Sequence, residues 1–303
     1  MCRNARSPIV VVAAGLALAA CSRPDGAGTV AAPQFAHVQD LIGTPDLIVD
    51  AKKLATSWVV YDQELKESFC SIDEADLAPG RYRVLRFTVN TPNIGDADVF
   101  IGSPWKHMDP NDDGSFADSD GLYEESTCHR HFHFRNYALY QLIDAATGKV
   151  FRARKNGFCM IDITPWSEEV PPGSWVYRSC GNSLVRGSGF QGISVGYGDE
   201  YFKWLGGQYF VLEGDPNAEP IPPGQYLLRI WVNPPFVARG KEVCPAKDPQ
   251  GLCHMFVESD YGNNIGQALI TIPAGRPGKT GFGPGGGQLA QDEAIDDENR
   301  PNK

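Results

Sequence analysis

The chain has 303 residues, with 37 acidic against 27 basic side chains, which gives a formal charge of −10. This charge excludes nucleic acid as a partner, because phosphate would be repelled, and it favours cationic partners such as primary amines and lysine-rich surfaces. The length leaves room for one domain with its own core between two terminal segments.

The first 20 residues are typical of a signal peptide, because basic residues precede an apolar run over 9–20 that is too short to span a bilayer. The run ends in Leu-Ala-Ala-Cys, which resembles the lipobox of bacterial lipoproteins, in which the cysteine is acylated. An ordinary signal peptide with Cys21 as a bystander is the alternative. Residues 21–42 are then a lipidated cysteine and an Ala-, Gly- and Pro-rich flexible tether. We expect an exported bacterial lipoprotein of the cell envelope, at the outer membrane or cell surface, that meets the membrane only through its lipid anchor.

Short alternating runs predict an all-β domain over residues 43–274, whereas helical periodicity is scarce. These runs recur between Gly and Pro turns at residues 82–89, 209–212, 226–232 and 268–272. Segment 156–198 holds too many Gly, Ser and Pro residues for continuous strands. We therefore predict a β-sandwich with long, disulfide-pinned loops that carry the active site.

An acidic stretch over residues 109–120 matches the start of an EF-hand calcium loop, with Asp120 in place of the final Glu. No helices are predicted to flank it, and it contains a proline. A solvated acidic loop is the favoured interpretation.

Three histidines follow at every second position, as His129, His131 and His133. Alternation in a strand would put them on one face, but the outer two would lie about 13 Å apart at about 3.3 Å per residue. A shared ion therefore requires a bend, a bulge or a loop end here. Imidazole trios suit copper, zinc or nickel, and copper binds most tightly of the three. A partly buried polar strand or a surface zinc scavenger is the alternative.

Six cysteines fall inside the predicted domain, and an oxidising compartment favours three disulfides among them. They are Cys70, Cys128, Cys159, Cys180, Cys244 and Cys253. The last two enclose a short segment, so we expect Cys244 to pair with Cys253. None has Cys-x-x-Cys spacing, which favours structural roles over metal binding.

Oxygen donors gather near the end of the domain, in residues 258–264, as a hard cation such as Ca²⁺ prefers. A hydrogen-bonded turn without metal is the alternative, because Asn and Asp stabilise turns unaided. From residue 275 the chain is Gly-rich and then charged, with almost nothing apolar to bury. We predict a disordered tail over 275–303.

Several motifs of this chain, taken in their order along the sequence, resemble the catalytic domain of the lysyl oxidase family. The resemblance covers essentially the whole predicted domain. The resemblance rests on the histidine trio after a cysteine and on residues 140–144, 155–159, 196–204, 223–234 and 258–264. In that family the trio holds copper, so the resemblance implies copper on His129, His131 and His133. It also implies a lysine tyrosylquinone made from Lys155 and Tyr197.

The activity implied is that of a copper-dependent amine oxidase. A quinone condenses with a primary amine or a lysyl side chain, and the products are an aldehyde, ammonia and, with dioxygen as oxidant, hydrogen peroxide. Asp144, Asp199 and Glu200 are candidates for the general base. The alternative is a non-catalytic copper-binding β-sandwich lipoprotein in which Lys155 and Tyr197 never crosslink.

The resemblance implies two further features. Family members share a calcium ion between the first and last strands, and the matching positions are Asp46, Leu47, Glu258, Asp260, Asn263 and Asn264. A family disulfide matches Cys128 with Cys180, which leaves Cys70 with Cys159. One departure from the animal enzymes is Ser126, which stands where they have a histidine before the trio.

Overall fold

Strands make up most of the secondary structure, which confirms the all-β prediction. The computed structural model describes residues 43–155, 157–240 and 242–287, all within the compact unit Gln34–Lys303. The predicted signal peptide, Cys21 and the tether lie outside the described residues. In the part of the chain that is described, no helix has the length and apolar character of a membrane span.

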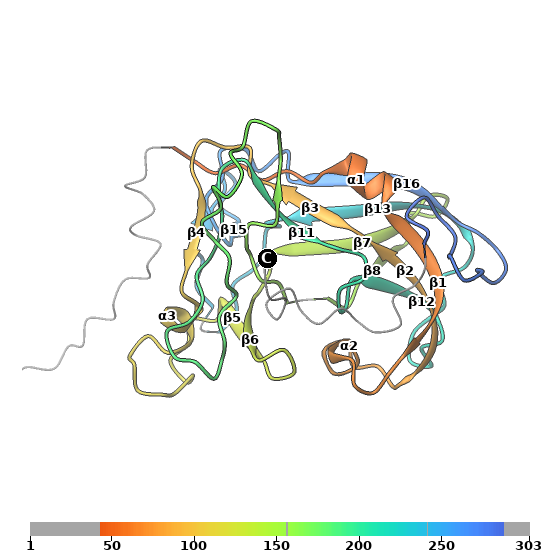
Figure 1. The fold of residues 1–303 in the computed structure, drawn as a ribbon, viewed down its shortest axis with the longest axis horizontal. Helices are drawn as coiled ribbons and strands as arrows, with labels where there is room; N and C mark the ends of the chain where they lie inside the picture. Colours follow the sequence, from red (N-terminus) through yellow and green to blue (C-terminus); the bar gives the residue numbers. More distant parts are fainter. Residues whose placement is uncertain (1–42, 156, 241, 288–303) are drawn as a thin grey trace, which may run out of the picture. The chain divides into compact units, whose positions relative to one another are not determined.

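Two antiparallel sheets face each other across the core (Figure 1). The first has the order β1 (Trp58–Leu65), β2 (Gly80–Phe87), β12 (Tyr209–Glu213). The second has the order β16 (Ile265–Ile272), β13 (Gly224–Val232), β7 (Ala138–Asp144), β8 (Val150–Arg152). Phe87 of the first sheet packs edge-on against Tyr140 of the second, with ring centroids 5.3 Å apart. Burial alternates along β16, as expected for a strand with one face on the core and one on solvent. The fold is therefore sandwich-like, as predicted.

Shorter elements lie around these sheets. The paired strands are β3 (Val89–Pro92), β11 (Tyr197–Tyr201) and β9 (Thr164–Pro165); β10 (Gln191–Ile193) and β4 (Val99–Gly102); β5 (Tyr123–Ser126) and β6 (His131–Phe134); β14 (Ala246–Lys247) and β15 (Cys253–His254). The helices described are α1 (Ala51–Thr56), α2 (Cys70–Glu74) and α3 (Pro104–Met108). The hairpin β5–β6 and the strand β11 position the candidate site.

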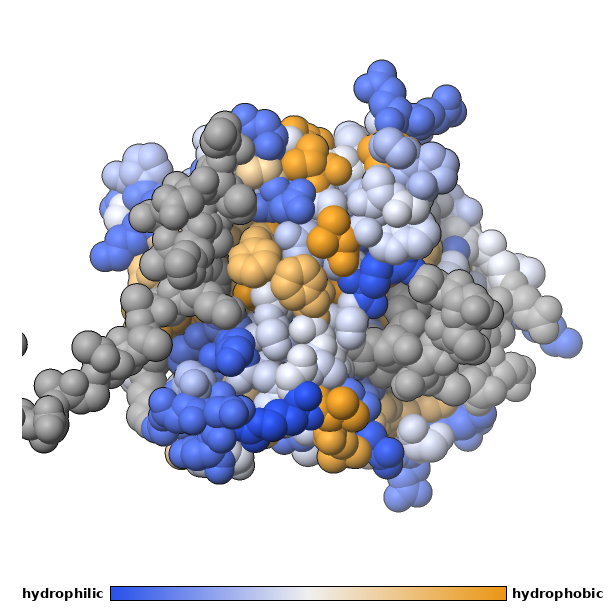
Figure 2. Space-filling view, turned by 60° about the vertical axis from the view of Figure 1, so that its left-hand side comes forward, coloured by the Kyte–Doolittle hydropathy of each residue, from blue (hydrophilic) through white to orange (hydrophobic). Residues whose placement is uncertain are grey.

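Among its described residues, the loop region between β8 and β11 contains two short strands, β9 and β10, as its composition predicted. Asp162, which is fully buried, organises it by accepting hydrogen bonds from the backbone N–H groups of Val176, Tyr177 and Ser194 and from the Ser194 hydroxyl. The region also exposes apolar side chains, namely Trp166, Trp175, Val176, Leu184, Val185 and Phe190. Figure 2, which brings the side of β4 and α3 forward, shows apolar residues among hydrophilic ones on that face.

The disulfides connect Cys70 with Cys128, Cys159 with Cys180, and Cys244 with Cys253. The third pair confirms the prediction. The predicted pairs Cys128–Cys180 and Cys70–Cys159 are wrong, because α2 packs beside the β5–β6 hairpin and because Cys180 returns to Cys159 within the same loop region. The Cα atoms lie 5.6 Å apart in the Cys70–Cys128 disulfide and 5.3 Å apart in the Cys159–Cys180 disulfide, within the range that a bridge requires.

The first part of the C-terminal tail is ordered, so the predicted disorder is wrong for residues 275–287. Phe282 exchanges two backbone hydrogen bonds with Val60, at 2.7 and 2.9 Å, and its ring packs on the core. The hydroxyl of Tyr61 donates to the Gly287 carbonyl at 2.9 Å. A free edge of β1 and one apolar ring are enough to hold this segment, although its composition is poor in apolar residues. Residues 288–303 lie outside the described residues.

Candidate metal centre

The three histidines are brought together by the turn of the β5–β6 hairpin. His131 and His133 lie in β6, and His129 lies in the turn before it. Arg130 has a φ of 59°, in the left-handed region, and its N–H bonds to the Ser126 carbonyl at 2.7 Å. This turn folds His129 back over the strand, which is the bend that the spacing of the histidines required.

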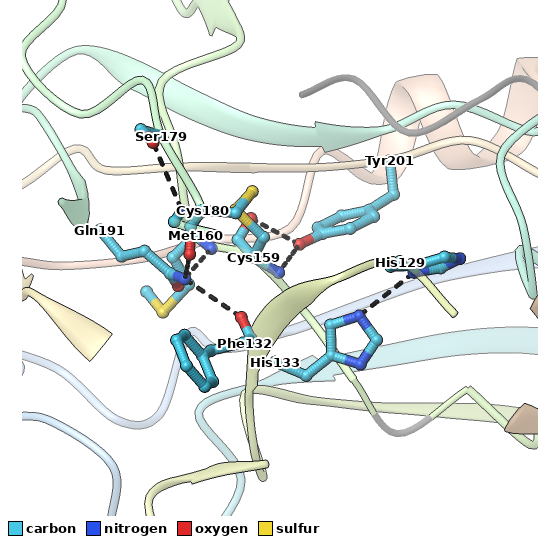
Figure 3. Close-up of a disulfide and its surroundings, with 10 residues drawn as sticks. His129, Phe132, His133, Cys159, Met160, Ser179, Cys180, Gln191 and Tyr201 are labelled. Atoms are coloured by element: carbon cyan, nitrogen blue, oxygen red, sulfur yellow. Dashed lines mark hydrogen bonds between the residues drawn. A yellow bond between two sulfur atoms is a disulfide. The ribbon is translucent and has the colours of Figure 1, made fainter. Parts of the chain in front are cut away.

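The histidine nitrogens are close enough to share one ion. One ring nitrogen from each histidine lies within 4.8 Å of the others, and His129 Nδ1 is 3.4 Å from His133 Nε2 (Figure 3). Two nitrogens bound to one ion at about 2.0–2.1 Å are separated by about 3–3.5 Å, so this pair already has coordinating geometry. A donor set of three imidazoles fits copper, zinc or nickel.

Burial keeps the site ready to bind metal. His131 and His133 are 4% and 6% exposed. The pKa of His133 lies well below its ordinary value, first because burial disfavours the imidazolium and then because of the positive charges of His131, Lys155 and His129. The neutral imidazole that results is the form that coordinates a metal ion.

Gly157 packs directly against the ring of His133. A Cβ built at this position would lie 2.0 Å from His133 Nδ1, so only glycine fits beside the ring. The sequence placed this glycine two residues after Lys155, but nothing in the sequence showed that it supports a histidine.

Lys155 lies over two aromatic rings beside the histidines. Its Nζ is 5.2 Å from the ring centroid of Tyr201 and 5.3 Å from that of Phe158. The Tyr201 hydroxyl donates to the Cys159 carbonyl and accepts from the Cys159 N–H, both at 2.7 Å. One small cavity is lined by Lys155, Tyr201 and all three histidines, beside the Cys159–Cys180 disulfide. Figure 3 shows Tyr201, His129 and His133 near this disulfide.

The structure does not bring Tyr197, the predicted partner of Lys155, into the cavity that Lys155 lines. Its hydroxyl lies 3.3 Å from Ser174 Oγ and 3.5 Å from the Pro171 carbonyl, in the loop region. Tyr197 and Tyr201 stand at opposite ends of β11, about 13 Å apart at about 3.3 Å per residue. Tyr197 and Tyr201 fall on the same face of β11. Tyr201 is the one at the end of the strand that meets the histidines.

Two of the three candidate bases line the small cavity. Asp199, which is 2% exposed, lines the small cavity beside Tyr201. Glu200 also lines it, but its carboxylate binds Lys53 Nζ at 2.6 Å and the Thr164 hydroxyl. Asp144 accepts backbone N–H groups in the turn after β7 and is not among the residues that line this cavity. Asp199 is therefore the candidate that the geometry retains.

A larger cavity of about 450 Å³ is also lined by His133 and Lys155. Its charged lining comes from α2, β5, the strands around β8 and the loop after β12, and includes Glu74, Glu124, Lys149, Arg154, Asp215 and Glu219. Burial raises the pKa of the Glu124 carboxyl. The positive charge of Arg135 lowers this pKa, and the negative charge of Glu74 raises it. This cavity is wide enough for a small ligand or an extended side chain.

Most of the predicted calcium ligands also come together. Buried Glu258 accepts the Leu47 N–H at 2.8 Å, the Asn233 amide at 2.9 Å and the Asn264 amide, and Asn263 donates to Asp46 at 2.9 Å. Asp260 instead accepts the Gly262 N–H in its own turn. Among the described residues, the Oδ1 atoms of Asn263 and Asn264 are buried without a hydrogen-bond partner. Burial is the main reason that the pKa of Glu258 rises to about 8.

The acidic loop over residues 109–120 holds a cationic side chain of the protein. Arg186 contacts Asp109 Oδ2 at 2.5 Å and donates from Nε to Asp112 at 2.7 Å. Asp109 also accepts the N–H groups of Asp113 and Gly114. A guanidinium therefore occupies the carboxylates that an EF-hand loop would offer to calcium.

Comparisons with known proteins indicate the family of the chain. The profile of the lysyl oxidase family matches residues 45–243. Lysyl oxidase homolog 1 of Homo sapiens is 27% identical over 235 residues, which are 74% of this chain and 32% of that protein. Lysyl oxidase homolog 4 of Homo sapiens is 25% identical over 241 residues, 76% of this chain and 25% of that protein.

Lysyl oxidase homolog 3A of Danio rerio is 27% identical over 201 residues, 63% of this chain and 23% of that protein. The chain therefore matches about a third or less of the length of these relatives. The matched profile covers two thirds of the chain and includes the three histidines, Lys155 and Tyr201. This chain belongs to the lysyl oxidase family.

Proposed function

We propose that this protein is a copper-dependent amine oxidase that converts primary amines or lysyl side chains into aldehydes, with release of ammonia and hydrogen peroxide. Its organic cofactor would be a quinone made from Lys155 and Tyr201. The observation that carries this proposal is the position of Lys155 Nζ, 5.2 Å from the Tyr201 ring, in a cavity lined by the three histidines.

The residues of the site fit this chemistry. Copper bound by His129, His131 and His133 would supply the oxidation of a nearby phenol by dioxygen. The Tyr201 hydroxyl accepts from the Cys159 N–H and donates to the Cys159 carbonyl, which fixes the ring, and the Lys155 amine lies over it. Once the phenol ring was oxidised to a quinone, the Lys155 amine could add to a ring carbon, so that a C–N bond would replace one N–H and one C–H bond and the electrons would pass to dioxygen.

Asp199 is the base that we propose for substrate oxidation. A quinone held there would supply an acceptor for the electrons of an amine substrate, and a base must take the proton from the carbon next to that amine. Asp199 lines the same cavity as Tyr201, and its negative charge contributes, after burial, to a raised pKa of the Tyr201 phenol. A carboxylate this close to the ring is in place to take that proton.

The substrate would enter through the larger cavity. Its volume of about 450 Å³ and its contact with Lys155 and His133 suit a small amine or a single lysyl side chain. The net charge of −10 favours the approach of either cation.

Calcium and an envelope location complete the proposal. Asp46, Glu258, Asn263 and Asn264 would hold the calcium ion, and the two buried amide oxygens support this because they are the hard donors that Ca²⁺ prefers. Lipidation at Cys21 would fix the protein to the envelope, and the three disulfides support an oxidising compartment. Loss of labelled fatty acid in Cys21→Ser would test the anchor.

Peptide mass spectrometry tests the quinone directly. The full chain is loaded with copper in air, treated with phenylhydrazine and digested, and we expect one hydrazone-labelled species that joins the peptides of Lys155 and Tyr201. Tyr201→Phe should lose both this species and the amine-dependent release of peroxide, whereas Tyr197→Phe should keep them. Unlinked, unmodified peptides from fully copper-loaded protein would leave a copper-binding protein without oxidase activity.

A further inference from the structure

A carboxylate from outside the hairpin lies against the histidine cluster. Glu74, the last residue of α2, has its Oε1 3.4 Å from His129 Nδ1 and 3.9 Å from His133 Nδ1. The same oxygen accepts a hydrogen bond from the Ser126 hydroxyl at 2.8 Å. The Glu74 side chain is 30% exposed and lines the larger cavity, so it lies between the histidines and the proposed entrance for the substrate.

Three connections hold this carboxylate in place. The Cys70–Cys128 disulfide ties the start of α2 to the residue before His129. The Ser126 hydroxyl donates to Glu74 and accepts the His129 N–H at 3.2 Å, so one group aligns the carboxylate with the histidine. Arg154 donates to the Ala75 carbonyl at 2.6 Å and fixes the chain directly after the helix.

The distances indicate a place inside the coordination sphere. His129 Nδ1 is the nitrogen that faces His133 Nε2 at 3.4 Å, and Glu74 Oε1 lies at the same distance from it. Donor atoms about 2.0–2.2 Å from one ion are separated by about 2.8–3.5 Å, so both neighbours of His129 Nδ1 meet this condition. His133 Nδ1 is the ring nitrogen that does not face His129. Glu74 Oε1 lies 3.9 Å from it, which is too far for a hydrogen bond.

We propose that Glu74 is a fourth protein ligand of the metal, which gives a donor set of three histidines and one carboxylate. This inference rests on the proposed function for the presence of copper. The carboxylate takes the coordination position that faces the substrate cavity, and its negative charge stabilises the divalent ion among three neutral imidazoles.

Copper binding to the apoprotein tests this proposal without any measurement of activity. Cu(II) is titrated at constant pH against a competing chelator, and the loaded proteins are compared by electron paramagnetic resonance. Glu74→Gln keeps the size of the side chain, and we expect it to weaken Cu(II) binding by at least about tenfold. Its spectrum should shift to a higher g∥ and a smaller A∥, because an anionic oxygen is lost. Glu125→Gln, on β5 and lining the same cavity, is the matched control and should change neither.

A second variant, Glu74→His, should restore tight binding and add nitrogen hyperfine coupling, because it supplies a new donor at the same place. A Glu74→Gln spectrum identical to that of the wild type overturns the proposal even if affinity falls, since the carboxylate would then only orient His129. Wild-type protein that binds no stoichiometric copper overturns both this inference and the proposed function. Copper bound with the expected Glu74 dependence but without a Lys155–Tyr201 crosslink would refute the oxidase and leave the ligand assignment standing.

Discussion

The position of His133 depends on the absence of a side chain at residue 157. The backbone of Gly157 lies against the imidazole ring, and the Lys155 side chain projects from the same segment. The lysine of the proposed cofactor and a metal ligand are therefore positioned by one short loop. Any residue larger than glycine must push the ring out of the histidine cluster or move the loop that carries Lys155.

We predict that Gly157→Ala weakens Cu(II) binding by about 10–100-fold, the range seen when the support of a metal ligand is lost. The added methyl group would overlap the His133 ring, which must then turn away from His129. Competition titration of the apoprotein measures the effect. Gly278→Ala is a suitable control, because a Cβ there meets no atom within 4 Å. Equal copper affinity in both variants would show that His133 does not need its present ring position.

At the scale of the elements, the hairpin β5–β6 is the unit that builds the candidate metal site, and a disulfide fastens it to α2. Cys128 is the residue before His129, so the Cys70–Cys128 bridge acts on the turn itself. Without it, α2 and the turn would be held together mainly by the contact of Glu74 with Ser126.

Replacing both Cys70 and Cys128 with serine should therefore have two effects. The free energy of unfolding should fall by about 2–5 kcal/mol, as for other native disulfides. Copper affinity should fall as well, because the turn that carries His129 gains freedom. The double serine variant of Cys244 and Cys253, which staple a loop elsewhere, should lose stability but keep copper affinity. Denaturant unfolding and copper titration together separate the two effects, and intact copper binding in the first variant would contradict this role of the disulfide.

The sequence predicted this element well where local geometry decides and poorly where distant segments meet. Alternating histidines could not share an ion along a flat strand, so a bend had to exist, and Arg130 provides it. The family resemblance indicated Tyr197 and not Tyr201, because only tertiary packing decides which end of β11 faces the histidines. Six cysteines allow 15 pairings, and the choice between Cys128 and Cys159 as the partner of Cys70 depends on where α2 packs. Glu74 gave no sequence signal, since a single glutamate at the end of a short helix has no distinguishing pattern.

For the whole molecule, the cluster around Glu258 joins the first and last parts of the domain. It connects the segment before α1 with the turn before β16, through Leu47 and Asp46 on one side and Asn263 and Asn264 on the other. The buried glutamate is costly as a carboxylate unless a cation compensates its charge. The cluster therefore makes the stability of the domain sensitive to pH, and a calcium ion bound there, as we propose, would add a dependence on calcium.

Because the pKa of Glu258 is raised to about 8 in the folded protein, folding favours its protonated form. Its contribution to stability is complete below the pKa of the unfolded chain, about 4.3, and is lost as pH rises through about 8. We predict that the calcium-free protein has a Tm that falls between pH 5 and pH 8, by about 2–4 °C for each kcal/mol lost.

Added Ca²⁺ should restore the Tm at pH 8 and have little effect at pH 5, where a proton already neutralises the site. Glu258→Gln removes the charge and should abolish both the pH dependence and the response to Ca²⁺. Calorimetry of the two proteins with and without Ca²⁺ tests this, and Mg²⁺ is the control ion. An equal response of the Glu258→Gln variant to Ca²⁺ would place the ion elsewhere.

The closeness of Lys155 and Tyr201 also bears on how the chain can come apart. A bond between them would close a covalent ring around the Cys159–Cys180 loop, and, unlike that disulfide, it would survive a reducing agent. Protein cut by a protease inside this ring would still migrate as one piece after reduction, whereas protein without the bond would separate into two. Each molecule could also make this ring only once, so a damaged cofactor could be replaced only by synthesis of a new chain.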